Sequence, residues 1–261
     1  MSAAPVRVAF AGPPAALEGR VPVAPAHGLV PLVATDGPRQ AGAIERFAPH
    51  VVVAFGAERP PAPSGVPVIA VREHGAVAGG ADRVVSFEAG GDGVWRRLPP
   101  PVDDRLFALP RGGARPAFFG ATTDRRERLL LSSKHQHDLL HVDSGAGVER
   151  RRALDATIAV GVNVHAGDEP AFEHTAAAHL AAGHLLISEP LAPLHGLEPG
   201  VDFLLAESTD DFVELIGSAL RTPGAHPRVR ACGRAKAEAF RASRVWARVV
   251  EDLRRDLRAF G

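Results

Sequence analysis

The chain is poor in several residue types, and each shortage excludes something. Its 261 residues include a single cysteine, Cys232, which rules out an intramolecular disulfide and a cysteine-rich metal site. Tyrosine is missing, and lysine occurs only at Lys134 and Lys236, so arginine supplies 28 of the 30 basic residues. Alanine, glycine and proline are abundant. We attribute this bias to GC-rich coding rather than to function.

Long apolar runs and an excess of one sign of charge are also missing. No apolar run approaches the roughly 18 residues needed to span a membrane, and the amino terminus lacks the pattern of a signal peptide. Basic and acidic residues both number 30, and the isoelectric point is near 7.2. A nucleic acid or membrane surface bound by bulk electrostatics is therefore not expected. We expect a soluble, cytoplasmic protein with no transmembrane segment.

The first hundred residues contain short apolar runs at regular intervals. The runs are continuous rather than alternating, which predicts strands buried on both faces of a parallel sheet. A helix is predicted over residues 39–48, because Pro49 marks its end. The predicted strands are 6–11, 29–34, 51–55, 66–71 and 83–87.

Residues 98–116 mix prolines with glycines, a composition typical of a domain linker. We predict an N-terminal α/β domain over 1–102, a linker over 103–116, a second α/β domain over 117–243 and a packing helix over 244–261. Thr209 is expected to cap a helix that starts at Asp210. The predicted strands of the second domain are 117–119, 140–142, 156–164, 185–188 and 203–206. The predicted helices are 124–139, 148–153, one from 171, 210–221, 227–240 and 244–260.

A phosphate-binding pattern follows the strand predicted at 117–119. A glycine turn, a hydroxyl-rich loop and two arginines open the next helix, and a diphosphate needs such backbone N–H groups and fixed positive charge. The residues are Gly120, Thr122, Arg125 and Arg126. The alternative is that both arginines are solvated and pair with Glu127 or Glu149.

Residues 172–205 predict a helix, a glycine stop, a buried strand and a loop. Glu173 begins the alanine-rich helix, and Gly183 ends it as a residue able to adopt positive φ does. Ser188 and Glu189 end the strand that follows. Ligands bind where such strands end in doubly wound sheets, so we expect these side chains to face a ligand.

With these motifs, residues 117–240 resemble the C-terminal half of family-4-like GT-B glycosyltransferases, closest to the spore-maturation-type group. The resemblance implies a GT-B-like α/β fold of two Rossmann-type domains, the N-terminal one shortened. It also implies transfer of a sugar from a nucleoside-diphosphate sugar to a hydroxyl or amine acceptor, which can be a small molecule or a glycan. Retention of anomeric configuration and independence from metal and cofactor are implied as well.

The resemblance also implies roles for single residues. Gly120, with Thr122 in the same loop, and Arg126 match the loop that binds the donor phosphates. Glu173 matches the acidic residue that binds the nucleotide ribose. The alternative for Glu173 is a first-turn glutamate stabilised by the helix dipole.

The sugar-binding positions depart from the family in one respect. Many members carry a second glutamate eight positions before the first, where this chain has His165. His165 and Glu189 are therefore the residues expected to meet the transferred sugar, with Ser188 in the same donor-facing loop. The alternative for Glu189 is a loop carboxylate that caps backbone N–H groups near residues 191–194.

The first domain offers two candidates. Gly12 follows the first strand and resembles the loop that faces the donor, although Pro13 and Pro14 remove amide donors there. A dinucleotide fingerprint is missing, which argues against a dehydrogenase. His74 follows the fourth strand and is the candidate acceptor base, the alternative being a solvated loop histidine.

Metal chemistry finds little support in the sequence. His137 and His141 are four residues apart with His135 nearby, but no carboxylate or cysteine completes a site. The chain lacks any Asp-x-Asp, which argues against a metal-dependent GT-A enzyme. The rival hypothesis is a non-catalytic module that binds a nucleotide sugar or a partner enzyme. The sequence leaves the oligomeric state open.

Overall fold

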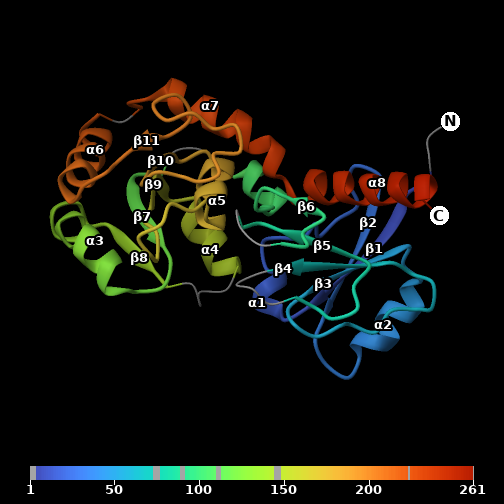
Figure 1. Ribbon diagram of the computed structural model, residues 1–261. Helices are drawn as coiled ribbons and strands as arrows, with labels where there is room; N and C mark the ends of the chain where they lie inside the picture. Colours follow the sequence, from blue (N-terminus) through green and yellow to red (C-terminus); the bar gives the residue numbers. More distant parts are fainter. Residues whose placement is uncertain are drawn as a thin grey trace. The chain divides into compact units, whose positions relative to one another are not determined.

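The computed structural model describes residues 4–72, 77–88, 92–109, 113–143, 148–222 and 224–260. The chain divides into two compact units, each with one parallel sheet flanked by helices (Figure 1). The first unit comprises Met1–Asp104 together with Arg241–Gly261, and the second comprises Arg105–Phe240. The predicted α/β class is confirmed.

The sheet of the first unit has the order β2-β1-β3-β4-β5-β6, and all its adjacent strands are parallel. The five strands predicted from apolar runs are confirmed, with small differences at their ends. The strands are β1 (Val6–Gly12), β2 (Leu29–Thr35), β3 (Val51–Phe55), β4 (Val68–Arg72), β5 (Arg83–Ser86) and β6 (Arg96–Arg97). The helices of this unit are α1 (Pro14–Leu17), α2 (Gln40–Phe47) and α8 (Ala242–Phe260).

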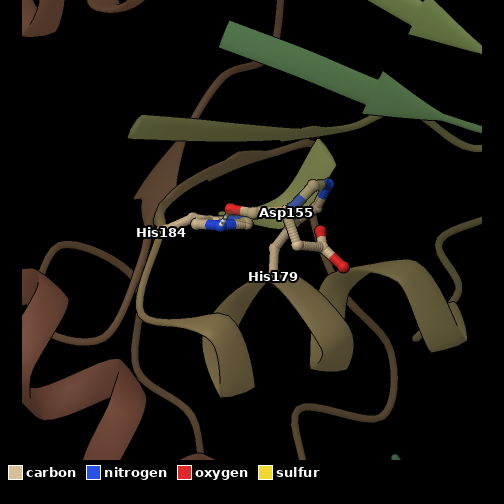
Figure 2. Close-up of side chains that lie close together, drawn as sticks. All are labelled: Asp155, His179 and His184. Atoms are coloured by element: carbon tan, nitrogen blue, oxygen red, sulfur yellow. Dashed lines mark hydrogen bonds between the residues drawn. The ribbon is translucent and has the colours of Figure 1, made fainter. Parts of the chain in front are cut away.

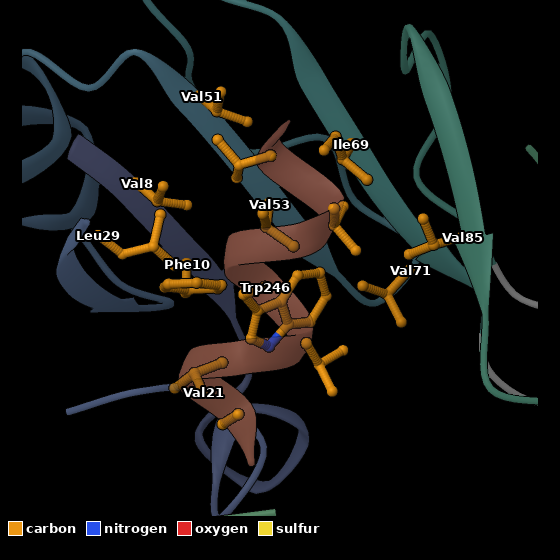
Figure 3. Close-up of a cluster of buried hydrophobic side chains, with 14 of the residues drawn as sticks. Val8, Phe10, Val21, Leu29, Val51, Val53, Ile69, Val71, Val85 and Trp246 are labelled. Atoms are coloured by element: carbon orange, nitrogen blue, oxygen red, sulfur yellow. The ribbon is translucent and has the colours of Figure 1, made fainter. Parts of the chain in front are cut away.

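Successive side chains of each strand point to opposite faces, so the first sheet has two cores. One core lies beneath α8, and Figure 3 shows Trp246 of that helix among the strand side chains. The Trp246 ring meets Phe10 and Phe55 edge-on at centroid distances of 5.4 and 5.8 Å, and its Nε1 donates to the Arg20 carbonyl. The other core consists mainly of small side chains beneath Ile44 of α2.

The sheet of the second unit has the order β11-β10-β9-β7-β8 and is also parallel. Leu130 of α3 and Phe212 of α6 fill one face together with Phe118, and Leu154 of α4 packs on the other. The strands are β7 (Arg115–Phe119), β8 (Leu140–Val142), β9 (Ile158–Asn163), β10 (Leu185–Ser188) and β11 (Leu204–Leu205). The helices are α3 (Asp124–His137), α4 (Val148–Asp155), α5 (His174–Ala182), α6 (Thr209–Arg221) and α7 (Pro227–Ala237), with 3-10 helices η1 (Asp104–Ala108) and η2 (Glu238–Phe240).

Three local features differ from the sequence predictions or refine them. Ser208, not Thr209, caps α6, because Ser208 has the extended backbone of a cap residue and its Oγ accepts from the Asp211 amide at 3.1 Å. Gly183 ends α5 with φ of 81°, as predicted. The segment predicted as a linker contains η1, in which Leu106 and Phe107 are buried.

Among the described helices, none has both the length and the hydrophobicity of a membrane span.

Candidate functional site

The carboxyl ends of β7, β9 and β10 meet at one edge of the second sheet, because neighbouring strands run parallel. The segments that follow them are 120–123, 164–173 and 189–194. These segments, together with the first turn of α3, carry the charged side chains that the sequence analysis singled out. The candidate site is therefore built from three neighbouring strand ends.

The first segment is a tight turn into α3. Gly120 leaves no room for a side chain, since a Cβ there would lie 2.7 Å from the Phe118 ring and 3.2 Å from Arg126 Nη1. Thr123 caps α3 by accepting from the Arg126 amide at 3.2 Å. Thr122 is exposed beside it. The turn thus presents backbone and a hydroxyl to solvent.

Arg126 is almost fully buried and joins the first two of these segments. Its Nη2 donates to both carboxylate oxygens of Glu173, at 3.1 and 3.0 Å. Nε donates to the Val164 carbonyl at 2.9 Å and Nη1 to the Ala121 carbonyl at 3.2 Å. Arg126 is therefore not solvated. Its carboxylate partner is Glu173 rather than the Glu127 that the alternative from the sequence proposed.

Arg125 has a carboxylate partner of its own. Its two terminal nitrogens donate to the two oxygens of Glu189 at 2.8 and 2.6 Å, and Nε donates to Asp168 at 2.9 Å. The Arg125 side chain is 21% exposed, against 6% for Arg126. Arg125 was not among the residues selected from the resemblance. Its position in the first turn of the helix was nevertheless a signal that the sequence offered.

Glu189 accepts from the His165 amide at 2.7 Å as well as from Arg125. Burial alone would raise the pKa of Glu189, but these hydrogen bonds outweigh burial and hold the pKa below its ordinary value. Its carboxylate therefore contacts Arg125 and the segment after β9, rather than the backbone near residues 191–194 that the alternative proposed. Glu189 is an ionised acceptor at this edge.

His165 lies between the two carboxylates. Its Nε2 is 2.7 Å from the Pro190 carbonyl oxygen, which can only accept, so Nε2 carries a proton. Its Nδ1 lies 3.8 Å from Glu173 Oε1, beyond hydrogen-bond length, so Glu173 attracts a proton there through its charge. Burial lowers the pKa of His165, but Glu173, the Pro190 carbonyl and Glu189 together raise it above the ordinary value.

Glu173 occupies the N-cap position of α5, yet its side chain makes no capping hydrogen bond. Its carboxylate faces Arg126 and also accepts from the Ala166 amide at 3.3 Å. The side chain is 24% exposed. An ion pair with Arg126, more than the helix dipole, positions this carboxylate.

Ser188 is fully buried at the end of β10 and serves its neighbours. Its Oγ donates to the Glu189 carbonyl at 2.7 Å and accepts from Asn163 at 3.0 Å, and Thr175 donates to Asn163 at 3.1 Å. These bonds fix the end of β10 against β9 and α5. Asn163 was not predicted, because nothing in its sequence context distinguishes it from a strand end.

Solved structures of similar fold were found, although no protein-family model and no curated protein matches the sequence. An alpha-glucosyltransferase solved with UDP-glucose and DNA containing an abasic site has a TM-score of 0.61 at 9% identity, covering 94% of this chain and 98% of its own. AviGT4, a glycosyltransferase involved in avilamycin A biosynthesis, has 0.59 at 15% identity, covering 96% and 98%. Anabaena HepE, solved with UDP and glucose, has 0.57 at 9% identity, covering 95% and 99%.

The fold is that of GT-B glycosyltransferases. At identities of 9–15% the likeness extends to the fold alone.

Two of the predicted residues belong to the first unit of this GT-B fold. Gly12 ends β1 with φ of 152°, and a Cβ there would lie 2.5 Å from the Phe55 carbonyl oxygen. Its lack of a side chain thus lets β1 and β3 end close together. His74 lies outside the described residues.

Two of the three histidines considered for metal binding make other contacts, and the third is exposed. His137 Nε2 lies 2.8 Å from the Val213 carbonyl oxygen of α6. His141 Nδ1 lies 2.9 Å from Lys134 Nζ, and its Nε2 lies 2.9 Å from the Gly120 carbonyl oxygen. The second contact connects β8 to the turn that begins at Gly120. His135 is exposed. Their expected lack of a metal stays a prediction.

Proposed function

We propose that the chain is a glycosyltransferase that moves a sugar from a nucleoside-diphosphate sugar to a hydroxyl or amine acceptor. The observation that carries this proposal is the convergence of two guanidinium groups and two carboxylates at the carboxyl edge of the second sheet. Ligands bind at this edge in open α/β sheets, and the similar structures include glycosyltransferases solved with UDP or UDP-glucose. We therefore place the donor here.

Arg125 is the better placed arginine for the leaving diphosphate. It is more exposed than Arg126, whose donors already serve Glu173 and two carbonyls. Phosphate oxygens accept the same pair of N–H groups that Glu189 accepts, so a diphosphate can replace Glu189 at Arg125. Arg126, to which the resemblance assigns the phosphates, then acts by holding Glu173. Stabilising the negative charge that develops on the leaving diphosphate is the contribution that lowers the reaction barrier most.

The other residues take the roles that the resemblance implies. Glu173 would bind the ribose, and Gly120 and Thr122 would line the phosphate loop. Glu189, once released from Arg125, and His165 would meet the sugar, and Ser188 would hold the loop that carries Glu189. His74 would be the acceptor base, and Gly12 would face the donor. Membership of the spore-maturation-type group, retention of configuration and independence from metal belong to the same proposal.

Donor binding tests the proposal directly. Titrations with UDP-, GDP-, dTDP- and ADP-sugars should show one nucleotide that binds, and Arg125→Gln and Glu173→Gln should each weaken that binding by about tenfold to a hundredfold, the value of a charged hydrogen bond. Arg128→Gln is the matched control, because Arg128 is an exposed arginine on the same helix. Equal effects of Arg125→Gln and Arg128→Gln would place the donor elsewhere.

A non-catalytic donor-binding module is the second candidate. One observation favours it: α1 has Pro13 at its N-cap and Pro14 at its first position, so the two residues after Gly12 offer no amide donor. Release of free sugar or transfer to an acceptor, lost in Glu173→Gln, would support the enzyme. Tight binding without turnover under any acceptor tested would support the module.

A further inference from the structure

A second group of polar side chains lies in the interior of the second unit, apart from the proposed donor residues. Asp155 ends α4, His179 lies in α5 and His184 follows Gly183 at the start of β10. Figure 2 shows the three side chains gathered beside α5. Their exposed fractions are 3%, 0% and 4%. This polar group is therefore sealed from solvent.

The nitrogen and oxygen atoms of this group converge. One potential ligand atom from each residue lies within 4.8 Å of the other two, and the Nδ1 atoms of His179 and His184 are 2.9 Å apart. His184 Nε2 lies 2.9 Å from the Asp155 carbonyl oxygen, which can only accept, so the proton of a neutral His184 sits on Nε2. Its Nδ1 lone pair then points at His179.

Packing holds the His179 ring in place. A Cβ on Gly161 would lie 2.3 Å from the ring, so only glycine at that position of β9 admits it. Phe119 packs against the ring from the side, at a centroid distance of 5.3 Å. The imidazole is thus pre-oriented toward His184, as the ligands of a metal site usually are.

Two atoms of the group are buried without a hydrogen-bond partner, Asp155 Oδ2 and His179 Nε2. Such atoms are rare in folded proteins and call for an ion, a water or a functional role. Burial this deep disfavours the charged form of an imidazole, so both rings are neutral and offer lone pairs. The unpartnered carboxylate oxygen adds a negative ligand.

We infer that Asp155, His179 and His184 bind a zinc ion that ties α4, α5 and β10 together. Two neutral imidazoles and a carboxylate are ligands that zinc prefers, with a water as the fourth. Zinc holds its ligand atoms about 3.5 Å apart. The two Nδ1 atoms, now 2.9 Å apart, therefore need to separate slightly, and a small shift of Asp155 completes the set. The bond from His184 to a backbone carbonyl is the outer contact that orients metal-binding histidines. Because the group is sealed, the ion is structural.

The nearby cation Arg151 opposes this binding and offers a test. Arg151 lies close enough to act electrostatically on Asp155, His179 and His184, and Arg230 acts likewise on His184. Arg151→Met retains an unbranched side chain but removes the guanidinium that lies over the Phe119 ring, and with it the charge. Zinc should therefore bind several-fold more tightly to Arg151→Met than to the unchanged chain.

Metal analysis of the full chain decides the inference. After zinc supplementation and dialysis we expect one zinc per chain, and a hundredfold excess of zinc over its Kd should raise the Tm by about 5 °C. Asp155→Asn and His184→Gln should weaken zinc binding by more than about tenfold, since even outer contacts are worth that much. His135→Gln, an exposed histidine, is the control and should change nothing.

The inference is overturned if the chain holds no zinc and zinc leaves the Tm unchanged, or if binding survives in both ligand variants. The group is then a hydrogen-bonded imidazole pair alone. Should the ligand variants fail to fold, Arg151→Met decides, because unchanged or weaker zinc binding in that variant contradicts a cation at this position. Donor binding is a separate measurement, so either proposal can fail without the other.

Discussion

Each guanidinium at the edge of the second sheet has a carboxylate partner, which is what allows charged groups to be buried there. The sequence led to Arg126, Glu173, His165 and Glu189, because residues at strand ends and helix starts can be located from the pattern. Which arginine pairs with which carboxylate depends on the path of the segment after β9, and no local pattern encodes that path. The sequence therefore placed Arg125 in the phosphate-binding pattern but could not predict its pairing with Glu189.

The buried pair His179 and His184 shows a second limit of sequence reasoning. The two are five residues apart, with a glycine helix stop between them, and Asp155 lies 29 residues before His184. Neither spacing matches a familiar metal motif, whereas the four-residue spacing of His137 and His141 does. The tertiary fold, which brings Asp155 at the end of α4 next to His184, assembles the group, and sequence proximity does not.

His165 gives stability a pH dependence of definite sign. Its pKa is raised above 6.5 in the folded state, so protonation adds stability that is fully present below that pH and is lost as pH rises through the folded-state pKa. The difference in unfolding free energy between the unchanged chain and His165→Gln should therefore shrink as the pH rises above 6.5. Denaturant titrations across this range measure it. A difference that stays constant or grows with pH contradicts the prediction, and His135→Gln should show no trend.

At the scale of elements, strands were predicted well because both faces of each sheet are covered. Continuous apolar runs such as 51–55 can hardly be anything but buried strands, and β3 (Val51–Phe55) matches that run. Helix ends and short elements were predicted less well. Leu106 and Phe107 are buried in a segment whose prolines and glycines suggested a linker, because composition does not report what packs on a short segment.

The start of α6 can be tested by a pair of variants. Ser208→Ala removes the hydroxyl that accepts from the Asp211 amide and should lower the free energy of unfolding of the second unit by about 1 kcal/mol. Thr209→Ala, one residue on, should cost much less, since Thr209 is already helical. Thermal or denaturant unfolding compares the two. The reverse order of effects would move the cap to Thr209.

At the scale of the whole molecule, the two units have separate cores. Trp246, Val249, Val250 and Leu253 of α8 are buried against the first sheet, whereas the second sheet is filled by α3 and α6. Periodicity predicted that α8 packs on an apolar surface. Periodicity could not predict which of the two units α8 joins, because many sheets can accept the same apolar stripe.

Trp246→Ala should destabilise the first unit by about 3–5 kcal/mol and leave the second unit unaffected. The reason is the loss of a fully buried ring that touches Phe10 and Phe55. Hydrogen exchange read peptide by peptide separates the units, and faster exchange in both would contradict separate cores. Leu257→Ala, on the same helix and 46% exposed, is the control and should have little effect.

The chain order of these units has a consequence for biosynthesis. Residues 105–240 interrupt the first unit, so the helix that covers one face of its sheet is translated last of its parts. On the ribosome the second unit can fold while the strands made earlier still expose valines and phenylalanines that only residues 242–260 will cover. During that interval the nascent chain presents a surface that chaperones recognise and that invites aggregation.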